Sequence, residues 1–111
     1  MRAWSEALNA GDDEAAADFF APGARVVQVG SVAILRTHED AVSWNAGLPC
    51  SGRIVSISRS GDTVKASFVL GERPAHRCDA PGATATAVFR VSDGLIVLWH
   101  QTGSEPPPDP L

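Results

Sequence analysis

The sequence predicts a single α+β domain in which short helices come first and mostly antiparallel strands follow. Apolar residues recur at three- and four-residue spacings over residues 3–20, as in amphipathic helices. Valine-rich or alternating stretches fill most of the remainder, and Gly, Pro, Asn and Asp separate them. The length of 111 residues is about one domain's worth and excludes a second. The contents of 44% hydrophobic and 20% charged residues are typical of a folded globular chain.

The N-terminal segment predicts two helices, because residues 9–12 (NAGD) interrupt its apolar pattern. Gly11 can end the first helix in the left-handed conformation, and Asp12 or Asp13 can cap the second. We expect the second helix to stop before residues 21–23 (APG), which form a turn signal.

A third short helix is predicted after Thr37, which can cap it with Asp40 at the capping-box position. Residues 47–49 (GLP) should end this helix. The remaining patterns predict strands joined largely as hairpins, with turns at residues 60–62 and 93–94. The strand-like stretches are residues 24–30, 32–35, 53–59, 63–72, 83–92 and 95–102.

Charge and composition exclude several classes of partner. The net charge of -4, with nine scattered basic residues, gives no positive stripe for nucleic acid. No apolar run is long enough to span a membrane, and the N-terminus does not resemble a signal peptide, so we expect a soluble, cytoplasmic protein. The domain should cover residues 1–103, and residues 104–111, with four prolines, should form an extended mobile tail.

The two cysteines, Cys50 and Cys78, are predicted to be reduced thiols, because a domain of this size can build its core without a disulfide. His76 and Cys78 lie two residues apart, but no second close pair completes a zinc pattern. We therefore expect no metal and no cofactor.

Four segments resemble the nuclear transport factor 2-like superfamily, in its SnoaL-like and ketosteroid-isomerase-like branch. They are WSEALNAGD at 4–12, FFAPGARVV at 19–27, HEDAVSW at 38–44 and FRVSDGLIVLWH at 89–100. The resemblance implies a cone-shaped, cystatin-like α+β fold. In it a curved antiparallel sheet of four to six strands is wrapped by three helices from the N-terminal half around an apolar pocket. Function does not follow from the fold, because the superfamily hosts several enzyme classes and binding proteins.

Ketosteroid isomerases use a carboxylate base together with a tyrosine and a protonated aspartic acid that hold the enolate oxygen. By the resemblance, the tyrosine falls on Trp4, the base on Gln28 and the aspartic acid on Ala87. Trp4 could still donate its indole N–H, but Gln28 cannot accept a proton near neutral pH. Ketosteroid isomerase activity is therefore excluded.

Two further branches place candidate residues in the segment 71–82 (GERPAHRCDAPG). In limonene-type epoxide hydrolases an aspartate–arginine–aspartate relay activates water; Arg73 matches the arginine, but the aspartates fall on Ala75 and Gln101. SnoaL-type cyclases use an acid/base aspartate assisted by a histidine, for which the candidates here are His76 and Asp79. The alternative is that His76 is a solvated loop residue beside Arg77 and Asp79.

Strand alternation and the resemblance together predict the residues that line the pocket. Gln28 and Gln101 would pair with each other or with water, or receive a polar ligand atom. The three tryptophans could line the pocket or simply fill the core. The expected lining residues are Trp4, Gln28, Trp44, Phe68, Ala87, Phe89, Trp99 and Gln101.

The leading functional hypothesis is a SnoaL-like domain that binds a hydrophobic small molecule, as a polyketide cyclase-like or isomerase-like enzyme of bacterial secondary metabolism. The alternative is a non-catalytic ligand-binding or dimerisation module. His100 should share the face opposite the pocket with Ile96 and Leu98, and apolar residues outside the pocket predict a homodimer through that convex face.

Overall fold

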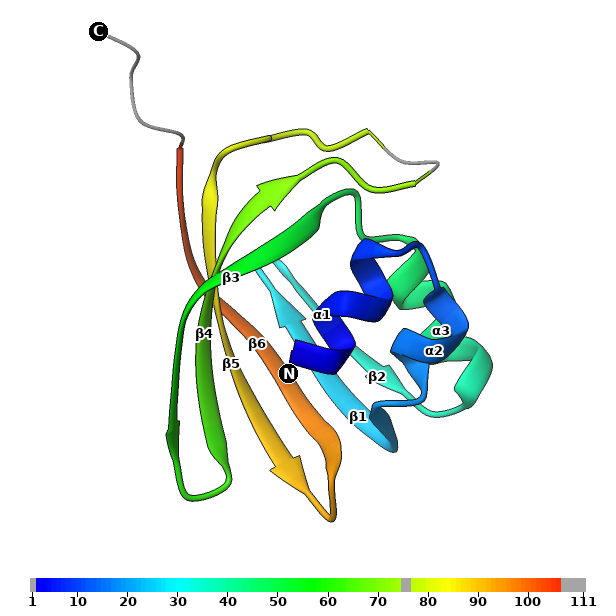
Figure 1. Cartoon of the computed structure of the whole chain (residues 1–111). Coiled ribbons are helices and arrows are strands. Elements are labelled where there is room, and N and C mark those ends of the chain that lie inside the picture. Colours follow the sequence, from blue (N-terminus) through cyan, green and yellow to red (C-terminus); the bar gives the residue numbers. More distant parts are fainter. Residues whose placement is uncertain (1, 75–76, 107–111) are drawn as a thin grey trace, which may run out of the picture.

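A computed structural model describes residues 2–74 and 77–106 (Figure 1). Three short helices lie on one side of a strongly bent six-stranded sheet. The predicted α+β class is confirmed. The helices are α1 (Arg2–Asn9), α2 (Asp13–Ala17) and α3 (His38–Ala46). The strands are β1 (Phe20–Gln28), β2 (Ser31–Leu35), β3 (Ser51–Ser60), β4 (Thr63–Gly71), β5 (Thr84–Ser92) and β6 (Leu95–Glu105).

The sheet has the order β2-β1-β6-β5-β4-β3 and is mixed rather than purely antiparallel. Strands joined by hairpins pair antiparallel as predicted, whereas β1 and β6 pair parallel. A tight turn forces consecutive strands to be antiparallel, but no turn joins β1 to β6. Turn signals in the sequence therefore could not predict this one pairing.

The residues that begin and end the helices are largely those that the sequence predicts. Gly11 follows α1 with φ +76°, which glycine adopts without strain. The Asp12 side chain accepts a hydrogen bond from the backbone N–H of Ala15 at 3.0 Å. Thr37 and Asp40 form the predicted capping box at the start of α3. Two of the three helices thus begin where a side chain satisfies their free N–H groups.

The first strand begins earlier than predicted. Phe20 starts β1 and is buried, and the register against β6 shifts between Phe20 and Arg25. This irregularity accommodates Pro22, which has no N–H to donate to a regular ladder. The turn signal at residues 21–23 therefore marks a bulge within a strand rather than its boundary.

The last strand extends further than predicted. Thr84 pairs with Glu105 and Ala85 with Ser104, so both residues 104 and 105 belong to β6 and not to a tail. Of the remaining predicted proline-rich tail, Pro106 follows β6 without regular secondary structure, and residues 107–111 lie outside the described residues.

A bulge in β6 changes which side chains face the helices. The register between β5 and β6 shifts so that Val97 is an extra residue in β6. Ile96 and Trp99, three residues apart, are consequently both buried. The sequence reading placed Ile96 on the outer face with Leu98 and His100, and this was wrong because the extra residue reverses the alternation.

An aromatic cluster centred on Trp4 of α1 fills the concave side of the sheet. The ring centroids of Phe20, Phe68, Phe89 and Trp99 lie 5.6 to 6.5 Å from that of Trp4 in edge-to-face geometry. Such pairs contribute about 0.5–1.5 kcal/mol each beyond the burial of their area. The cluster therefore fixes α1 against β1, β4, β5 and β6.

A buried arginine connects the end of β4 to the helices. The side chain of Arg73 is fully buried, and its Nη1 donates to the backbone carbonyl oxygens of Asn45 and Leu48, both at 2.8 Å. Its Nη2 pairs with the carboxylate of Asp13 in α2. Asn45 in turn accepts a 2.9 Å hydrogen bond from Trp4 Nε1. One guanidinium thus holds α2, α3 and, through Asn45, the position of Trp4.

We predict that Arg73→Ala lowers the free energy of unfolding by about 3–5 kcal/mol, because it leaves Asp13 without its buried partner and removes the guanidinium donor from the carbonyl oxygens of Asn45 and Leu48. Urea denaturation followed by circular dichroism measures this loss. The matched control is Arg77→Ala, which removes an exposed arginine and should change stability by less than about 0.5 kcal/mol. Equal effects of the two substitutions would contradict the structural role of Arg73.

Candidate functional site

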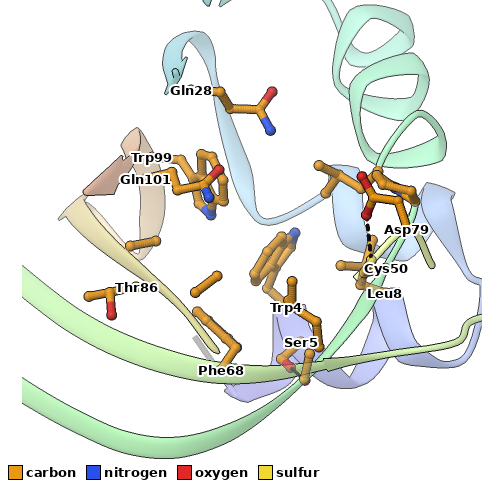
Figure 2. Close-up of a pocket in the computed structure, with 16 residues that line it drawn as sticks. Trp4, Ser5, Leu8, Gln28, Cys50, Phe68, Asp79, Thr86, Trp99 and Gln101 are labelled. Atoms are coloured by element: carbon orange, nitrogen blue, oxygen red, sulfur yellow. Dashed lines mark hydrogen bonds between the residues drawn. The ribbon is translucent and has the colours of Figure 1, made fainter. Parts of the chain in front are cut away.

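A cavity of about 230 Å³ lies between α1 and the concave side of the sheet, bounded by the segments before β3 and after β4 (Figure 2). Its volume is below the roughly 300–1,000 Å³ of typical pockets for drug-sized ligands. It is lined by Trp4, Ser5, Leu8, Gln28, Leu48, Pro49, Cys50, Gly52, Phe68, Leu70, Asp79, Ala85, Thr86, Ala87, Trp99 and Gln101.

The structure places six of the eight residues expected to line the pocket on the cavity wall. The other two, Trp44 and Phe89, lie behind it. Phe89 is fully buried beneath Trp4 and Trp99, with ring centroids 5.6 and 6.3 Å away. Trp44 packs against the ring of Trp99 at 5.0 Å. Both have the predicted inward orientation, but the rings of Trp4 and Trp99 separate them from the space.

The two tryptophans on the wall differ in their hydrogen bonding. Trp4 Nε1 donates to Asn45 Oδ1, so its N–H is not free for a ligand. Trp99 is 7% exposed, and its Nε1 has no hydrogen-bond partner among the described residues. Of these two tryptophans, the one with an unpartnered indole N–H is therefore Trp99 on β6 and not Trp4 on α1, where the family resemblance would put the donor.

Gln28 and Gln101 come from the neighbouring strands β1 and β6, each one residue after the paired positions Val27 and His100. Both side chains are half-buried and lie on the Trp99 side of the cavity (Figure 2). Within the described part of the chain, no hydrogen bond joins the two amides. Their donors and acceptors are thus open to the cavity.

Of the two candidate catalytic residues, Asp79 is described by the structure and His76 is not. Asp79 lies on the cavity wall, and its Oδ1 is 3.4 Å from Cys50 Sγ (Figure 2). Its side chain is exposed, and it enters the cavity from the side opposite Gln28 and Gln101. His76 lies outside the described residues.

Cys50 and Cys78 form a disulfide, so the prediction of two reduced thiols was wrong for this structure. The cysteines are 28 residues apart, but β3 and β4 form a hairpin whose open end pairs Ser51 with Gly71. This brings the segments flanking the hairpin together, and the two Cα atoms lie 4.5 Å apart. The sequence alone could not predict this disulfide, because the register of the β3–β4 hairpin determines that the two cysteines meet.

Arg73, which matches the arginine of the epoxide hydrolase relay, does not line the cavity. Its guanidinium is directed to Asp13 and to the carbonyl groups of α3 and the segment that follows it. Gln101, at one of the relay's aspartate positions, is on the wall. The relay residues therefore do not come together at the cavity.

A second, smaller cavity of about 170 Å³ lies where the end of α2 and the start of β1 meet α3, beside His38. His38 Nε2 is 3.0 Å from Glu14 Oε2, and Nδ1 is 3.5 Å from Asp18 Oδ1. The hydrogen bond with Glu14 raises the pKa of His38 above its usual value despite partial desolvation, and the charges of Asp18, Glu14 and Glu39 add to this. All of these side chains are at the surface, so the pairs are solvated contacts between helices.

Among the described residues, no helix is long and apolar enough to cross a membrane.

Solved structures with the same fold include proteins of several descriptions, all below 25% identity. A hypothetical protein with a ketosteroid isomerase-like fold from Catenulispora acidiphila, in complex with trimethylamine, is 21% identical with a TM-score of 0.73, covering 92% of this chain and 82% of that chain. A protein assigned as a polyketide cyclase from Sinorhizobium meliloti is 19% identical with a TM-score of 0.70, covering 89% of each chain. A cystatin-fold protein from Novosphingobium aromaticivorans is 16% identical with a TM-score of 0.70, covering 92% of this chain and 93% of that chain. These likenesses establish the fold.

No curated protein sequence matches this chain. The model of the SnoaL-like domain matches residues 1–99, which is most of the sequence and includes every element from α1 to the middle of β6. The chain therefore belongs to the SnoaL-like domain family.

Proposed function

We propose that the chain binds a small, largely apolar molecule that carries a hydrogen-bond acceptor, and that Trp99 Nε1 donates to this acceptor. The observation that carries the proposal is the buried indole N–H of Trp99 on a cavity wall, without a partner among the described residues. A buried donor without an acceptor costs about 1–3 kcal/mol. A ligand oxygen at this position would recover that free energy.

The other lining residues support the same class of ligand. Phe68, Leu70 and Ala87 present apolar surface, whereas the amides of Gln28 and Gln101 lie near the indole. Apolar walls with a few converging polar groups are typical of sites that bind small molecules. The amides can donate to the same ligand oxygen or accept from a neighbouring hydroxyl group.

The volume favours a ligand with one or two rings. A cavity of about 230 Å³ is small for a four-ring skeleton. By the family resemblance, Gln28 and Ala87 also fall at two positions where ketosteroid isomerases have a catalytic carboxyl group. We therefore place the ligand among monocyclic or bicyclic carbonyl compounds.

Trp99→Phe tests the role of the indole N–H with two probes of similar shape, acetophenone and ethylbenzene. The wild-type protein should prefer acetophenone, because only that probe has an acceptor oxygen. The substitution should reduce this preference by about fivefold or more, equivalent to about 1 kcal/mol, since it removes the donor and keeps an aromatic ring. Calorimetric titration of both probes gives the ratio of dissociation constants.

Trp44→Phe is the matched control, because Trp44 contacts Trp99 but does not line the cavity. The Trp44→Phe substitution should leave the ratio of the two dissociation constants, for acetophenone and ethylbenzene, unchanged. A wild-type protein that binds both probes equally, or a Trp99→Phe variant that keeps the preference, would contradict the proposal.

A second candidate function is acid–base catalysis on the bound carbonyl compound, as in a cyclase-like or isomerase-like enzyme. The observation that favours it is the carboxylate of Asp79 on the cavity wall, across from Trp99 and the glutamines (Figure 2). Asp79 would accept a proton from the carbon next to the carbonyl group while Trp99 stabilises the oxygen. His76 remains a proposed partner of Asp79.

Exchange of the acetophenone methyl protons for deuterium in heavy water tests this chemistry, because it requires only proton removal next to the carbonyl group. We expect Asp79→Asn to reduce the exchange rate to that measured without protein. His76→Ala should also lower the exchange rate, by a larger factor than it weakens the binding of acetophenone. Asp93→Asn, in the β5–β6 turn, is the control and should have no effect. Probe binding without exchange in the wild-type protein would instead identify a non-catalytic binding module.

We further propose a homodimer through the convex face of the sheet. The helices lie on the other side (Figure 1), and Val69, Val88 and Leu98 are only half-buried in the central strands. Leu98→Lys should convert the dimer into a monomer, because it adds charge beside Arg25 and Arg90, which pair with position 98. Light scattering measures the mass, and Val29→Lys, on the β1–β2 hairpin, is the control. A monomeric wild-type protein at micromolar concentration would contradict the dimer.

We keep the cytoplasm as the proposed location. In that compartment thiols are held reduced, whereas the Cys50–Cys78 disulfide would persist in an oxidising one. The working state of the two cysteines in the cytoplasm is then the dithiol.

A further inference from the structure

Cys50, Cys78 and Asp79 bring three potential metal ligands to one end of the cavity. Their two Sγ atoms and a carboxylate oxygen all lie within 4.8 Å of one another. Cys50 and Asp79 line the cavity, and Cys78 is buried behind them. The sequence pattern did not indicate this group, because Cys50 comes from the segment before β3 and the other two from the segment after β4.

We propose that reduction of the Cys50–Cys78 disulfide creates a site for a thiophilic divalent cation, of which Zn²⁺ is the type, held by the two thiolates and the carboxylate of Asp79. Thiolate and carboxylate groups are ligands that Zn²⁺ accepts in tetrahedral sites. The inference does not depend on which small molecule the cavity binds.

The spacing of the groups suits tetrahedral coordination. With Zn–S near 2.3 Å and Zn–O near 2.1 Å, a tetrahedral angle separates sulfur and oxygen ligands by about 3.6 Å. Cys50 Sγ and Asp79 Oδ1 lie 3.4 Å apart. The same geometry requires about 3.8 Å between the two sulfur atoms. Cysteines whose Cα atoms are 4.5 Å apart can reach this separation by side-chain rotation once the bond is broken.

The reductive step is a two-electron exchange with a phosphine or dithiol reductant. The S–S bond breaks and the two sulfur atoms gain two electrons and two protons. With a phosphine, water supplies both protons and the oxygen of the phosphine oxide; with a dithiol, the reductant gives up its own two protons and becomes a disulfide. Metal binding then releases both thiol protons to solvent, because the thiolate is the ligand. The disulfide form has no thiolate to offer, so the redox state determines whether the site exists.

The surroundings already hold one ligand in place. The backbone N–H of Cys78 donates to Glu72 Oε2 at 2.9 Å, and the backbone carbonyl of Glu72 accepts from Ser51 Oγ at 2.8 Å. These two bonds connect Cys78 to the start of β3, next to Cys50. The segments that carry the sulfur atoms therefore keep contacts independent of the disulfide.

Three protein ligands would leave the fourth tetrahedral position for water or a ligand atom. Because Cys50 and Asp79 form part of the cavity wall, this position faces the cavity. An open position of this kind is characteristic of catalytic rather than structural zinc sites. The reduced, metal-bound chain would then offer a Lewis acid at the end of the cavity opposite Trp99.

The experiment titrates Co²⁺ into the full chain after reduction with a phosphine and its removal under nitrogen. We expect one equivalent of Co²⁺ to give thiolate-to-cobalt charge-transfer absorption and the intense visible bands of tetrahedral Co²⁺, and Zn²⁺ to displace it. The disulfide form should give neither signal. Circular dichroism before titration verifies that the reduced chain is folded; a reduced chain that unfolds would overturn the proposal.

Substitutions identify the ligands. Cys50→Ser should abolish the charge-transfer signal or weaken Co²⁺ binding at least 100-fold, and Asp79→Asn should weaken it at least tenfold. Asp93→Asn is the control and should bind as the wild type does, because the β5–β6 turn is at the other end of the sheet (Figure 1). A folded, reduced wild-type chain that binds no Co²⁺, or binding that Asp79→Asn leaves unchanged, would overturn the assignment.

Discussion

The buried guanidinium of Arg73 is the interaction on which the arrangement of the helices depends. An unpaired charge at this depth would be too costly, so the chain must supply Asp13 and the carbonyl oxygens of Asn45 and Leu48. These carbonyls lie at the C-terminal end of α3 and just beyond it, where the regular donors of the helix run out. The two Nη groups of Arg73 are thus paired, whereas its Nε has no hydrogen-bond partner among the described residues. The helices keep their position over the sheet because moving one of them would leave a buried charge or carbonyl unpaired.

The same network determines the polarity of the cavity. Because Arg73 fixes the backbone of Asn45, the Asn45 side chain is in place to accept from Trp4 Nε1. Trp4 therefore presents only an apolar ring to the cavity, and the free indole donor is that of Trp99. The sequence alone does not tell which of the two tryptophans has a free indole N–H. The difference arises from Asn45, which is 41 residues from Trp4 in the sequence and accepts a hydrogen bond from its N–H.

Features set by neighbouring residues were predictable, and features set by distant pairings were not. Gly11, the Thr37–Asp40 capping box and the hairpin turns act within a few residues, so the sequence pattern identifies them. The Asp13–Arg73 pair, the β1–β6 pairing and the Cys50–Cys78 disulfide join segments that only the folded chain brings together. The extra residue at Val97 reverses the side-chain alternation of β6, and no glycine or proline at that position indicates it in the sequence. Strand alternation correctly placed Phe68 of β4 and Ala87 of β5 on the cavity wall, because no extra residue interrupts those two strands.

The polar groups of the cavity are distributed in a way that would orient a ligand. Trp99, Gln28 and Gln101 occupy one side, with neutral donors and acceptors, and Asp79 occupies the other, with a negative charge (Figure 2). A carbonyl oxygen is favoured beside the indole N–H and disfavoured beside the carboxylate, so a carbonyl compound has one preferred direction. That direction places its acidic hydrogens toward Asp79. Among the described residues that line the cavity, Asp79 supplies the one carboxylate, and it comes from the segment between β4 and β5. If Asp79 is the base in the proposed chemistry, proton transfer would take place at this end of the cavity, where Asp79 Oδ1 lies 3.4 Å from Cys50 Sγ.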